Sequence, residues 1–245
     1  MHTFDNALGT VMELFSGHQN TWPQEGVPHQ GFSSTGIVLP FVRGLLGLDG
    51  SALEKTASFR PGFPASWPAV SVDNWKIGEA AIGLEFSREK DRIGLRIRSE
   101  KAGGFRFVFA PALGLGASAF TASANGRPLD VAVDERPSGQ SLRPRLEFPL
   151  TGDDTIELRF VPGPEIVLPD AASTTGDASV GLRLVRSRLS GGDLVLSFEG
   201  RAGESYTIEV LNSERIETVS GAAFDGHVLT VAFPASSASY ATGAV

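Results

Sequence analysis

Cysteine is absent from this 245-residue sequence, and histidine, methionine and tyrosine are scarce, with 4, 2 and 2 residues. Without cysteine the chain has no disulfide framework, no thiolate ligand for zinc and no cysteine nucleophile. The absence is compatible with a reducing or an oxidising compartment. Metal-binding motifs, phosphate-binding loops and nucleophile elbows are also missing, so we expect neither a metal nor a cofactor.

The sequence also has no excess of basic residues. Lys and Arg number 21 against 28 Asp and Glu, which gives a formal net charge of -7 and a pI near 5.2. Binding to nucleic acid depends on clustered cations that neutralise phosphates. We therefore expect no nucleic-acid partner, whereas a neutral ligand is compatible with this charge.

Long hydrophobic runs are lacking too. No stretch of about 18 apolar residues predicts a membrane-spanning helix, so we expect no membrane partner. The N-terminal residues MHTFDNALGTVMELFSG lack the basic start, apolar run and small-residue cleavage site of a signal peptide. These features favour a cytoplasmic location.

A two-residue hydrophobic period is the main pattern that is present, and it begins at residue 69. Apolar residues alternate there with polar ones, and Gly, Pro, Asp and Asn interrupt the runs, which is typical of half-buried antiparallel strands. We predict a mainly β protein with an antiparallel β-sandwich over 69–168, a linker over 169–179 and a second β module over 180–245. One sandwich with a long extension is the alternative. The predicted strands are AVSVDNWKIG, AIGLEFSRE, RIGLRIRSE, FRFVFAP, TIELRFVPG, GLRLVRSRL, DLVLSFEG, SYTIEVLN and HVLTVAFP.

The first 48 residues have a helical pattern instead. Apolar residues spaced by three and four predict a short amphipathic helix from Asp5 to Phe15, with Asp5 as its N-cap. A second helix is predicted from about Phe32 to Leu48, and it is apolar almost all round, which is typical of a buried helix. Pro40 should kink or break it. Residues 49–68 read as an extended tether rather than a regular element.

Polar and aromatic residues gather in the loop between these two predicted helices. Aromatic rings can stack on the C–H face of a sugar, Gln, His and Ser can bind its hydroxyls, and a carboxylate can take a proton from water. Each residue also has a structural interpretation: solvated helix surface for Glu13, local packing for the aromatics, and capping for the histidines and serines. Two histidines alone do not make a metal site. The set comprises Glu13, His18, Gln19, Trp22, Glu25, His29, Gln30, Phe32 and Ser33.

Two further groups in the predicted strands are candidate sites. Asp73, Asn74 and Trp75 could form a carbohydrate-binding face, although an aromatic residue in a strand is more often part of the core. Asp153 and Asp154 precede a strand, where Asp is expected for its hydrogen bonds to the backbone.

Three stretches of the sequence resemble a known family when taken in order: ELFSG, VPHQGFSSTGIVLPFVRGLLGL and FRPGFPASWPAVSVDNWKIG. They are similar to the C-terminal end of bacterial six-hairpin glycosidases of the glycogen-debranching, amylo-alpha-1,6-glucosidase-like type. The later FRFVFAPALGLGA, NGRPL, GLRL and EGRAGESYTIEV look like the C-terminal β region of those proteins. The resemblance spans nearly the whole chain and is sharpest from Glu13 to Leu48.

The resemblance implies an (α/α)6 barrel followed by a β-sandwich, with the predicted helical hairpin as the end of the barrel. By its position before the HQGFS segment, Glu13 matches the general base that the resemblance implies, and Glu25 is the alternative because it lies in the loop itself. His29, Gln30 and Phe32 would line the sugar pocket, and His18 and Trp22 are further candidates for sugar contacts.

The chain departs from the family pattern because most helices of the barrel are missing from it. Twelve helices of about 11 residues need well over 130 residues, whereas only residues 1–48 have a helical pattern here. An inverting glycosidase also needs a general acid about 6.5–9.5 Å from the base, and it would come from an earlier helix.

We therefore expect the C-terminal portion of a glycoside hydrolase that acts on α-glucan or a related oligosaccharide and is inactive alone. The alternative is a non-catalytic β-sandwich protein that binds carbohydrate or serves as a scaffold. In isolation the apolar helix 32–48 should fold onto the sandwich, self-associate with another copy, or leave apolar surface exposed.

Overall fold

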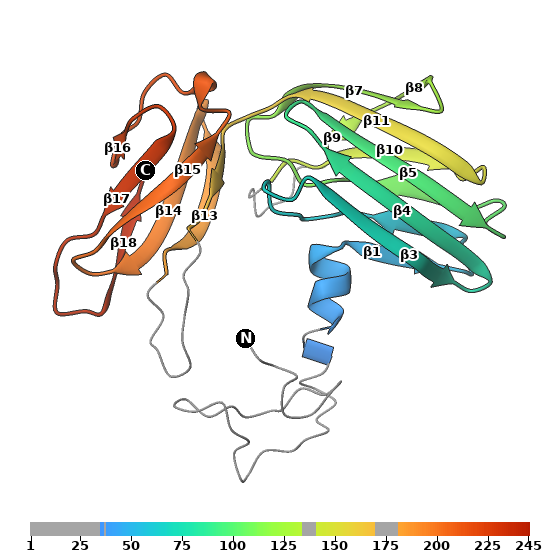
Figure 1. Ribbon diagram of the computed structural model, residues 1–245, viewed down its shortest axis with the longest axis horizontal. Coiled ribbons are helices and arrows are strands. Elements are labelled where there is room, and N and C mark those ends of the chain that lie inside the picture. Colours follow the sequence, from blue (N-terminus) through green and yellow to red (C-terminus); the bar gives the residue numbers. More distant parts are fainter. Residues whose placement is uncertain (1–34, 37, 134–140, 170–180) are drawn as a thin grey trace, which may run out of the picture.

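The computed structural model describes residues 35–36, 38–133, 141–169 and 181–245 of the chain, and it is mainly β (Figure 1). Largely antiparallel sheets form two sandwiches, which confirms the mainly β part of the predicted fold class, whereas a helical hairpin before them is not shown in these residues. The first predicted helix, residues 5–15, lies outside the described residues, as do residues 170–179 of the predicted linker.

The first sandwich has a six-stranded sheet in the order β3-β4-β5-β11-β7-β8 and a five-stranded sheet in the order β1-β2-β6-β10-β9. β2 and β6 pair in parallel, and the chain between them forms β3, β4 and β5 of the other sheet. The other pairings of the five-stranded sheet are antiparallel. The six-stranded sheet comprises β3 (Ala69–Ile77), β4 (Ala80–Arg88), β5 (Arg92–Glu100), β7 (Ser118–Ala124), β8 (Arg127–Leu129) and β11 (Asp153–Val161). The five-stranded sheet comprises β1 (Leu48–Ser51), β2 (Thr56–Phe59), β6 (Arg106–Phe109), β9 (Ala132–Val133) and β10 (Pro144–Pro149).

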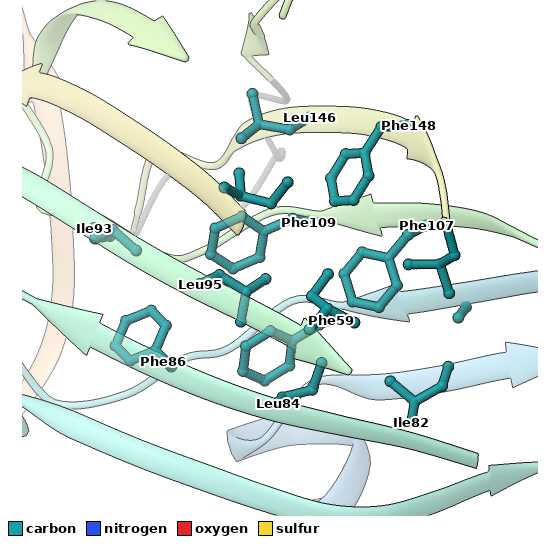
Figure 2. Close-up of a cluster of buried hydrophobic side chains, with 14 of the residues drawn as sticks. Phe59, Ile82, Leu84, Phe86, Ile93, Leu95, Phe107, Phe109, Leu146 and Phe148 are labelled. Atoms are coloured by element: carbon teal, nitrogen blue, oxygen red, sulfur yellow. The ribbon is translucent and has the colours of Figure 1, made fainter. Parts of the chain in front are cut away.

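The core of the first sandwich lies between these two sheets and is rich in phenylalanine. The alternating strands turn every second side chain inward, as the pattern of β4 shows, and each inward residue is buried. Phe59 stacks on Phe109 with ring centroids 5.8 Å apart and meets Phe86 edge-on at 6.3 Å. Figure 2 shows these rings between the strands, together with Leu84 and Leu95.

The second sandwich is smaller, with a four-stranded sheet in the order β12-β15-β17-β16 and a three-stranded sheet in the order β13-β14-β18. Phe198 of β14, Ile208 of β15 and Leu229 of β17 share one buried cluster, so the two sheets pack face to face. The strands are β12 (Glu165–Val167), β13 (Arg183–Ser190), β14 (Asp193–Arg201), β15 (Ser205–Leu211), β16 (Ala223–Phe224), β17 (Val228–Ala232) and β18 (Tyr240–Ala244).

All nine predicted strands are present, but two predicted boundaries differ from the structure. The tether predicted over 49–68 contains most of β1 and all of β2, because TASF turns Ala57 and Phe59 inward against the core once it pairs with β6. The strand β12, at the end of the predicted first sandwich, pairs instead with β15 of the second. Both strands are too short to be recognised without their partners.

The second predicted helix ends earlier than expected and is only partly buried, on one side. Helical backbone is present at 35–36 and 38–39, and a π-helix, η1 (Pro40–Leu45), follows. Pro40 therefore lies where the backbone changes from α-helical to π-helical form, and its missing N–H removes one helical hydrogen bond there. The prediction that the helix runs to Leu48 is wrong, since Leu48 already pairs with Phe59 in β1–β2.

Polar contacts connect the two sandwiches. Nη2 of Arg88 lies 2.5 Å from Oε1 of Glu165, which also accepts a hydrogen bond from the amide of Gly114 at 3.1 Å. Asn212 donates from Nδ2 to the carbonyl oxygen of Gly163 at 3.0 Å, and Arg215 donates from Nη1 to that of Pro162 at 2.8 Å. We call this set, together with the exposed ion pair Lys90–Glu214, the junction.

Candidate functional site

The residues that the resemblance assigns to catalysis and sugar binding all lie outside the described ranges, so their roles stay predictions. They are Glu13, Glu25, His18, Trp22, His29, Gln30 and Phe32.

A hollow on the outward face of the five-stranded sheet is the candidate site among the described residues. Its volume is about 700 Å³, and a second hollow of about 400 Å³ shares Ala132 and Arg145 with it. We call the two together the outer trough. The larger hollow is lined by Asp49, Gly50, Ser51, Glu54, Thr56, Ala57, Ser58, Arg60, Arg106, Val108, Ala132, Val133 and Arg145, and the smaller by Pro128, Leu129, Asp130, Ala132, Arg145 and Glu147.

Strand alternation and register produce the hollow. Because Ala57, Phe59, Phe107 and Phe109 point into the core, their neighbours in β2 and β6 must point outward. The outward residues align in a row across β1, β2, β6 and β10, which runs Asp49, Ser58, Val108, Glu147. Short side chains occupy the middle of the row and longer ones its ends, so the middle forms a shallow floor.

Three charged residues of the rim pair with one another, and Asp49 pairs with an arginine outside the trough. A carboxylate oxygen of Glu147 lies 2.7 Å from Nη1 of Arg106, and its other oxygen lies 2.7 Å from Nη2 of Arg145. Asp49 lies 3.4 Å from Nη2 of Arg43 in η1. Three arginines and four carboxylates line the outer trough, so its formal charges nearly cancel.

The spacing of Asp49 and Glu147 argues against their acting together as the acid and base of an inverting glycosidase. They stand at opposite ends of a four-strand row, and three strand spacings of about 4.8 Å place their backbones roughly 14 Å apart. An inverting glycosidase holds its two carboxyl groups about 6.5–9.5 Å apart. These two carboxylates are therefore better placed to accept hydrogen bonds from a ligand than to act on it as an acid–base pair.

The buried carboxylate of Asp154 belongs to a structural network. Burial raises the pKa of Asp154, but hydrogen bonds outweigh this effect and hold the pKa below its usual range. Thr151 donates from its hydroxyl at 2.6 Å and from its amide at 2.9 Å, and Asn125 donates from Nδ2 at 2.9 Å. These bonds tie the start of β11 to the β7–β8 turn, so this carboxylate stabilises the fold.

A serine–histidine pair in the second sandwich does not form a catalytic triad. Oγ of Ser213 lies 3.1 Å from Nδ1 of His227. The nearby carboxylate of Asp225 accepts hydrogen bonds from the backbone amides of His227 and Val228, at 3.0 and 2.8 Å, rather than from the imidazole ring. No third group therefore orients the histidine as a general base among the bonds described.

The core interpretation of Trp75 is confirmed, because its side chain packs against the core of the first sandwich. The strand bulges between Val72 and Trp75, where Asn74 has a positive φ of 56°. The bulge thus lets Trp75 reach the core, and the alternative of a carbohydrate-binding aromatic face at this position is not favoured.

Among the described residues, no group of three or more Asp, Glu, His or Cys side chains could hold a metal ion. No helix in the described part of the chain is long and apolar enough to cross a membrane. In comparisons with known proteins, no family model matches the chain, and no curated protein matches it either.

The outer trough was not predicted from the sequence, although part of its signal was present. The alternation in FRFVFAP predicts that Arg106 and Val108 point away from the core. Their neighbours in the trough come from β1, β2, β9 and β10, which were not predicted as strands. The sequence could therefore indicate single outward residues but not their alignment.

Proposed function

We propose that this chain is the C-terminal portion of a glycoside hydrolase that acts on α-glucan or a related oligosaccharide. In this proposal the two β-sandwiches support a helical catalytic barrel and contribute no catalytic residue themselves. The sequence resemblance from Glu13 to Leu48 suggests the barrel, and the shape of the helical segment before β1 supports it.

The observation that carries the proposal is the two-sided apolar character of residues 38–46. Val42, Leu45 and Leu46 pack against the sandwich core, and the carbonyl oxygen of Leu45 accepts a hydrogen bond from the amide of Gly62 at 2.9 Å. The exposed large apolar residues of the same segment are Val38 (57% exposed), Leu39 (51%) and Phe41 (48%).

A helical segment that is apolar on both sides is typical of a layer between two packed bodies. The sandwich covers one side, and helices of a barrel would cover the other. Clustered exposed apolar side chains of this kind mark an interaction surface. Glu13 would act as the general base, with Glu25 as the alternative, and an earlier helix would supply the general acid.

The sequence of the DNA upstream of the Met1 codon provides the first test. We expect an in-frame region that encodes helical hairpins, with a further Asp or Glu in an aromatic-rich loop. A ribosome-binding site directly before Met1 with no such region would contradict the proposal.

The decisive test of catalysis is Glu13→Gln in the complete enzyme, assayed on maltooligosaccharides and small α-glucosides. Removal of a general base should lower kcat by about 10²- to 10⁴-fold while the thermal unfolding curve stays unchanged. Glu25→Gln is the matched comparison, since the two residues compete for the role. Full activity in both variants would remove the assignment.

A non-catalytic carbohydrate-binding protein remains the second candidate function, and the outer trough is the observation that favours it. This candidate predicts that the 245-residue chain binds oligosaccharide without any barrel. It also predicts that neither this chain nor a longer product of the same gene hydrolyses the ligand.

A further inference from the structure

We infer that the outer trough binds an uncharged, hydroxyl-rich ligand, namely a segment of an α-glucan chain. The substrate class rests on the proposed function, whereas the position of the site and the neutrality of its ligand rest on the geometry of the trough. Nothing in the resemblance assigns a role to this face of the five-stranded sheet.

The floor and the rim of the trough offer two kinds of contact. Val108, Ala132 and Val133 present apolar surface, and Val133 is 43% exposed. Thr56 and Ser58 place hydroxyl groups on the same outward face. A sugar ring has C–H groups on its faces and hydroxyl groups at its edge, so it can contact both at once.

The rim supplies hydrogen-bond donors and acceptors in fixed places. Arg106 and Arg145 hold the two oxygens of Glu147 between them, so the three side chains restrain one another at one end of the residue row. Asp49 stands at the opposite end. A carboxylate that already accepts from arginine still has lone pairs for a hydroxyl donor, and each guanidinium has further N–H groups. Rigid donors and acceptors reduce the entropy lost on binding.

The charge pattern gives no net preference for an ionic ligand. A phosphorylated or sulfated ligand would be attracted by Arg60, Arg106 and Arg145 but repelled by Asp49, Glu54 and Glu147, and an ammonium ligand would meet the reverse. An uncharged polyol avoids both repulsions. No aromatic ring lines the outer trough as it is described, so the affinity rests on hydrogen bonds and should be modest.

The test is a titration of the 245-residue chain with maltoheptaose. Backbone-amide NMR locates the binding site, and calorimetry measures the Kd. We expect saturable shifts at Ser58, Val108 and Glu147. Ser58→Tyr should raise the Kd by about tenfold or more, because the new ring fills the floor. Glucose 6-phosphate serves as a charged probe and should bind no more tightly than glucose.

Thr207→Tyr is the matched control. Thr207 is an exposed residue on β15 of the second sandwich, so the same ring is added to an outward strand position away from the trough. It should leave the Kd unchanged within about twofold. Thermal unfolding of both variants shows whether the fold is retained, and Arg145→Ala gives a second trough variant that removes side-chain atoms instead of adding them.

The results separate this inference from the proposed function. An unchanged Kd in Ser58→Tyr and Arg145→Ala, or no shift in the trough at saturating maltoheptaose, overturns the inference even if the complete enzyme hydrolyses α-glucan. Trough-dependent binding by a protein whose complete form hydrolyses no glucan overturns the proposed function and leaves the binding site standing.

Discussion

Asp154 illustrates how much one residue position can contribute to the fold. Its side chain is buried, with 1% exposure, and it accepts hydrogen bonds from Thr151 and Asn125. Asn125 in turn accepts at Oδ1 from the amide of Thr155 at 2.8 Å, and with Gly126 it forms a turn with positive φ at both positions. An Asn-Gly pair of this kind is the preferred connection of a tight hairpin. The carboxylate therefore fixes the β7–β8 hairpin to β11.

The first prediction concerns Asp154→Asn. An amide cannot accept at both positions, so a donor is left unsatisfied, and the free energy of unfolding at pH 7 should fall by about 1–3 kcal/mol. Because folding lowers the pKa of Asp154, its stabilising effect is full above the unfolded value of about 3.9 and is lost as pH falls through the lower folded value. Urea unfolding at pH 7 and below pH 4 measures both effects.

The neighbouring Asp153 provides the control for that experiment. Its carboxylate pairs with Arg96 at 3.0 Å on the exposed face of the sheet, where solvent screening leaves an ion pair little net effect on stability. Asp153→Asn should therefore have a much smaller effect than Asp154→Asn at pH 7. Equal effects of the two substitutions, or an Asp154→Asn effect that does not shrink in acid, would contradict the assigned network.

Residue roles of this local kind were partly predictable. The interpretation of Asp154 as a residue that binds nearby backbone is confirmed by the Thr151 amide, which is three positions away. The row Asp49, Ser58, Val108, Glu147 was not predictable in the same way, because its members come from four strands. Hydrophobic alternation fixes the direction of a side chain, whereas strand order and register decide its neighbours.

At the scale of elements, all strands of eight or nine residues were predicted, whereas most shorter strands and the proline-bounded β10 were not. β4, β5 and β11 each have nine residues, and the patterns of β4 and β11 bury every second side chain in their central parts. β10 alternates as well, but it begins and ends with proline, which argues against a strand. It pairs at Pro144 only with the two-residue β9, which explains why proline is tolerated near this edge.

Gly47 explains why the predicted helix stops early. Its φ is +69°, and a Cβ at this position would lie 2.1 Å from the carbonyl oxygen of Arg60. The carbonyl of Gly47 accepts a hydrogen bond from the amide of Arg60 at 2.8 Å. Glycine thus ends the helical segment and starts the pairing of β1 with β2. The sequence shows a glycine at this position, but only the structure shows that it approaches Arg60.

The second prediction concerns the junction between the sandwiches. The side chains of Arg88 and Glu165 are only 12% and 11% exposed, so removing one partner leaves a largely buried charge. Arg88→Ala or Glu165→Ala should each lower the free energy of unfolding by about 3 kcal/mol. The double variant should cost less than the sum, with a coupling of about 1–3 kcal/mol. Urea unfolding followed by tryptophan fluorescence reports the first sandwich through Trp67 and Trp75.

The pair Lys90–Glu214 is the matched control, because it also spans the junction but is 60% and 56% exposed. Its double-mutant cycle should give a coupling much smaller than that of Arg88–Glu165, because solvent screens the exposed pair. A coupling for Arg88–Glu165 as small as that of this exposed pair would show that the buried ion pair does not hold the junction.

At the scale of the whole molecule, the two sandwiches meet through polar contacts, whereas apolar surface gathers on the helical segment before β1. Backbone also approaches backbone closely at the junction, where a Cβ on Gly163 would lie 2.4 Å from the carbonyl oxygen of Leu115. The sequence predicted two β modules from a change in composition, but it could not assign β12 to the second, because that assignment depends on pairing with β15.

The last prediction is self-association of the isolated chain through Val38, Leu39 and Phe41. Their exposed side chains lose contact with water if two copies meet, so the average mass in sedimentation equilibrium should rise with concentration. The double variant Leu39→Ser and Phe41→Ser should raise the dimer Kd by about tenfold or more.

Val185→Ser with Leu189→Ser tests whether apolar exposure alone produces this association. Val185 and Leu189 lie on β13 of the second sandwich and are about as exposed, at 55% and 50%. If their loss lowers association equally, the helical segment is not a specific interface. If only the helical variant lowers it, the segment is a specific interaction surface, as the proposed barrel requires. A complete enzyme with that barrel should then remain monomeric at concentrations where the 245-residue chain associates.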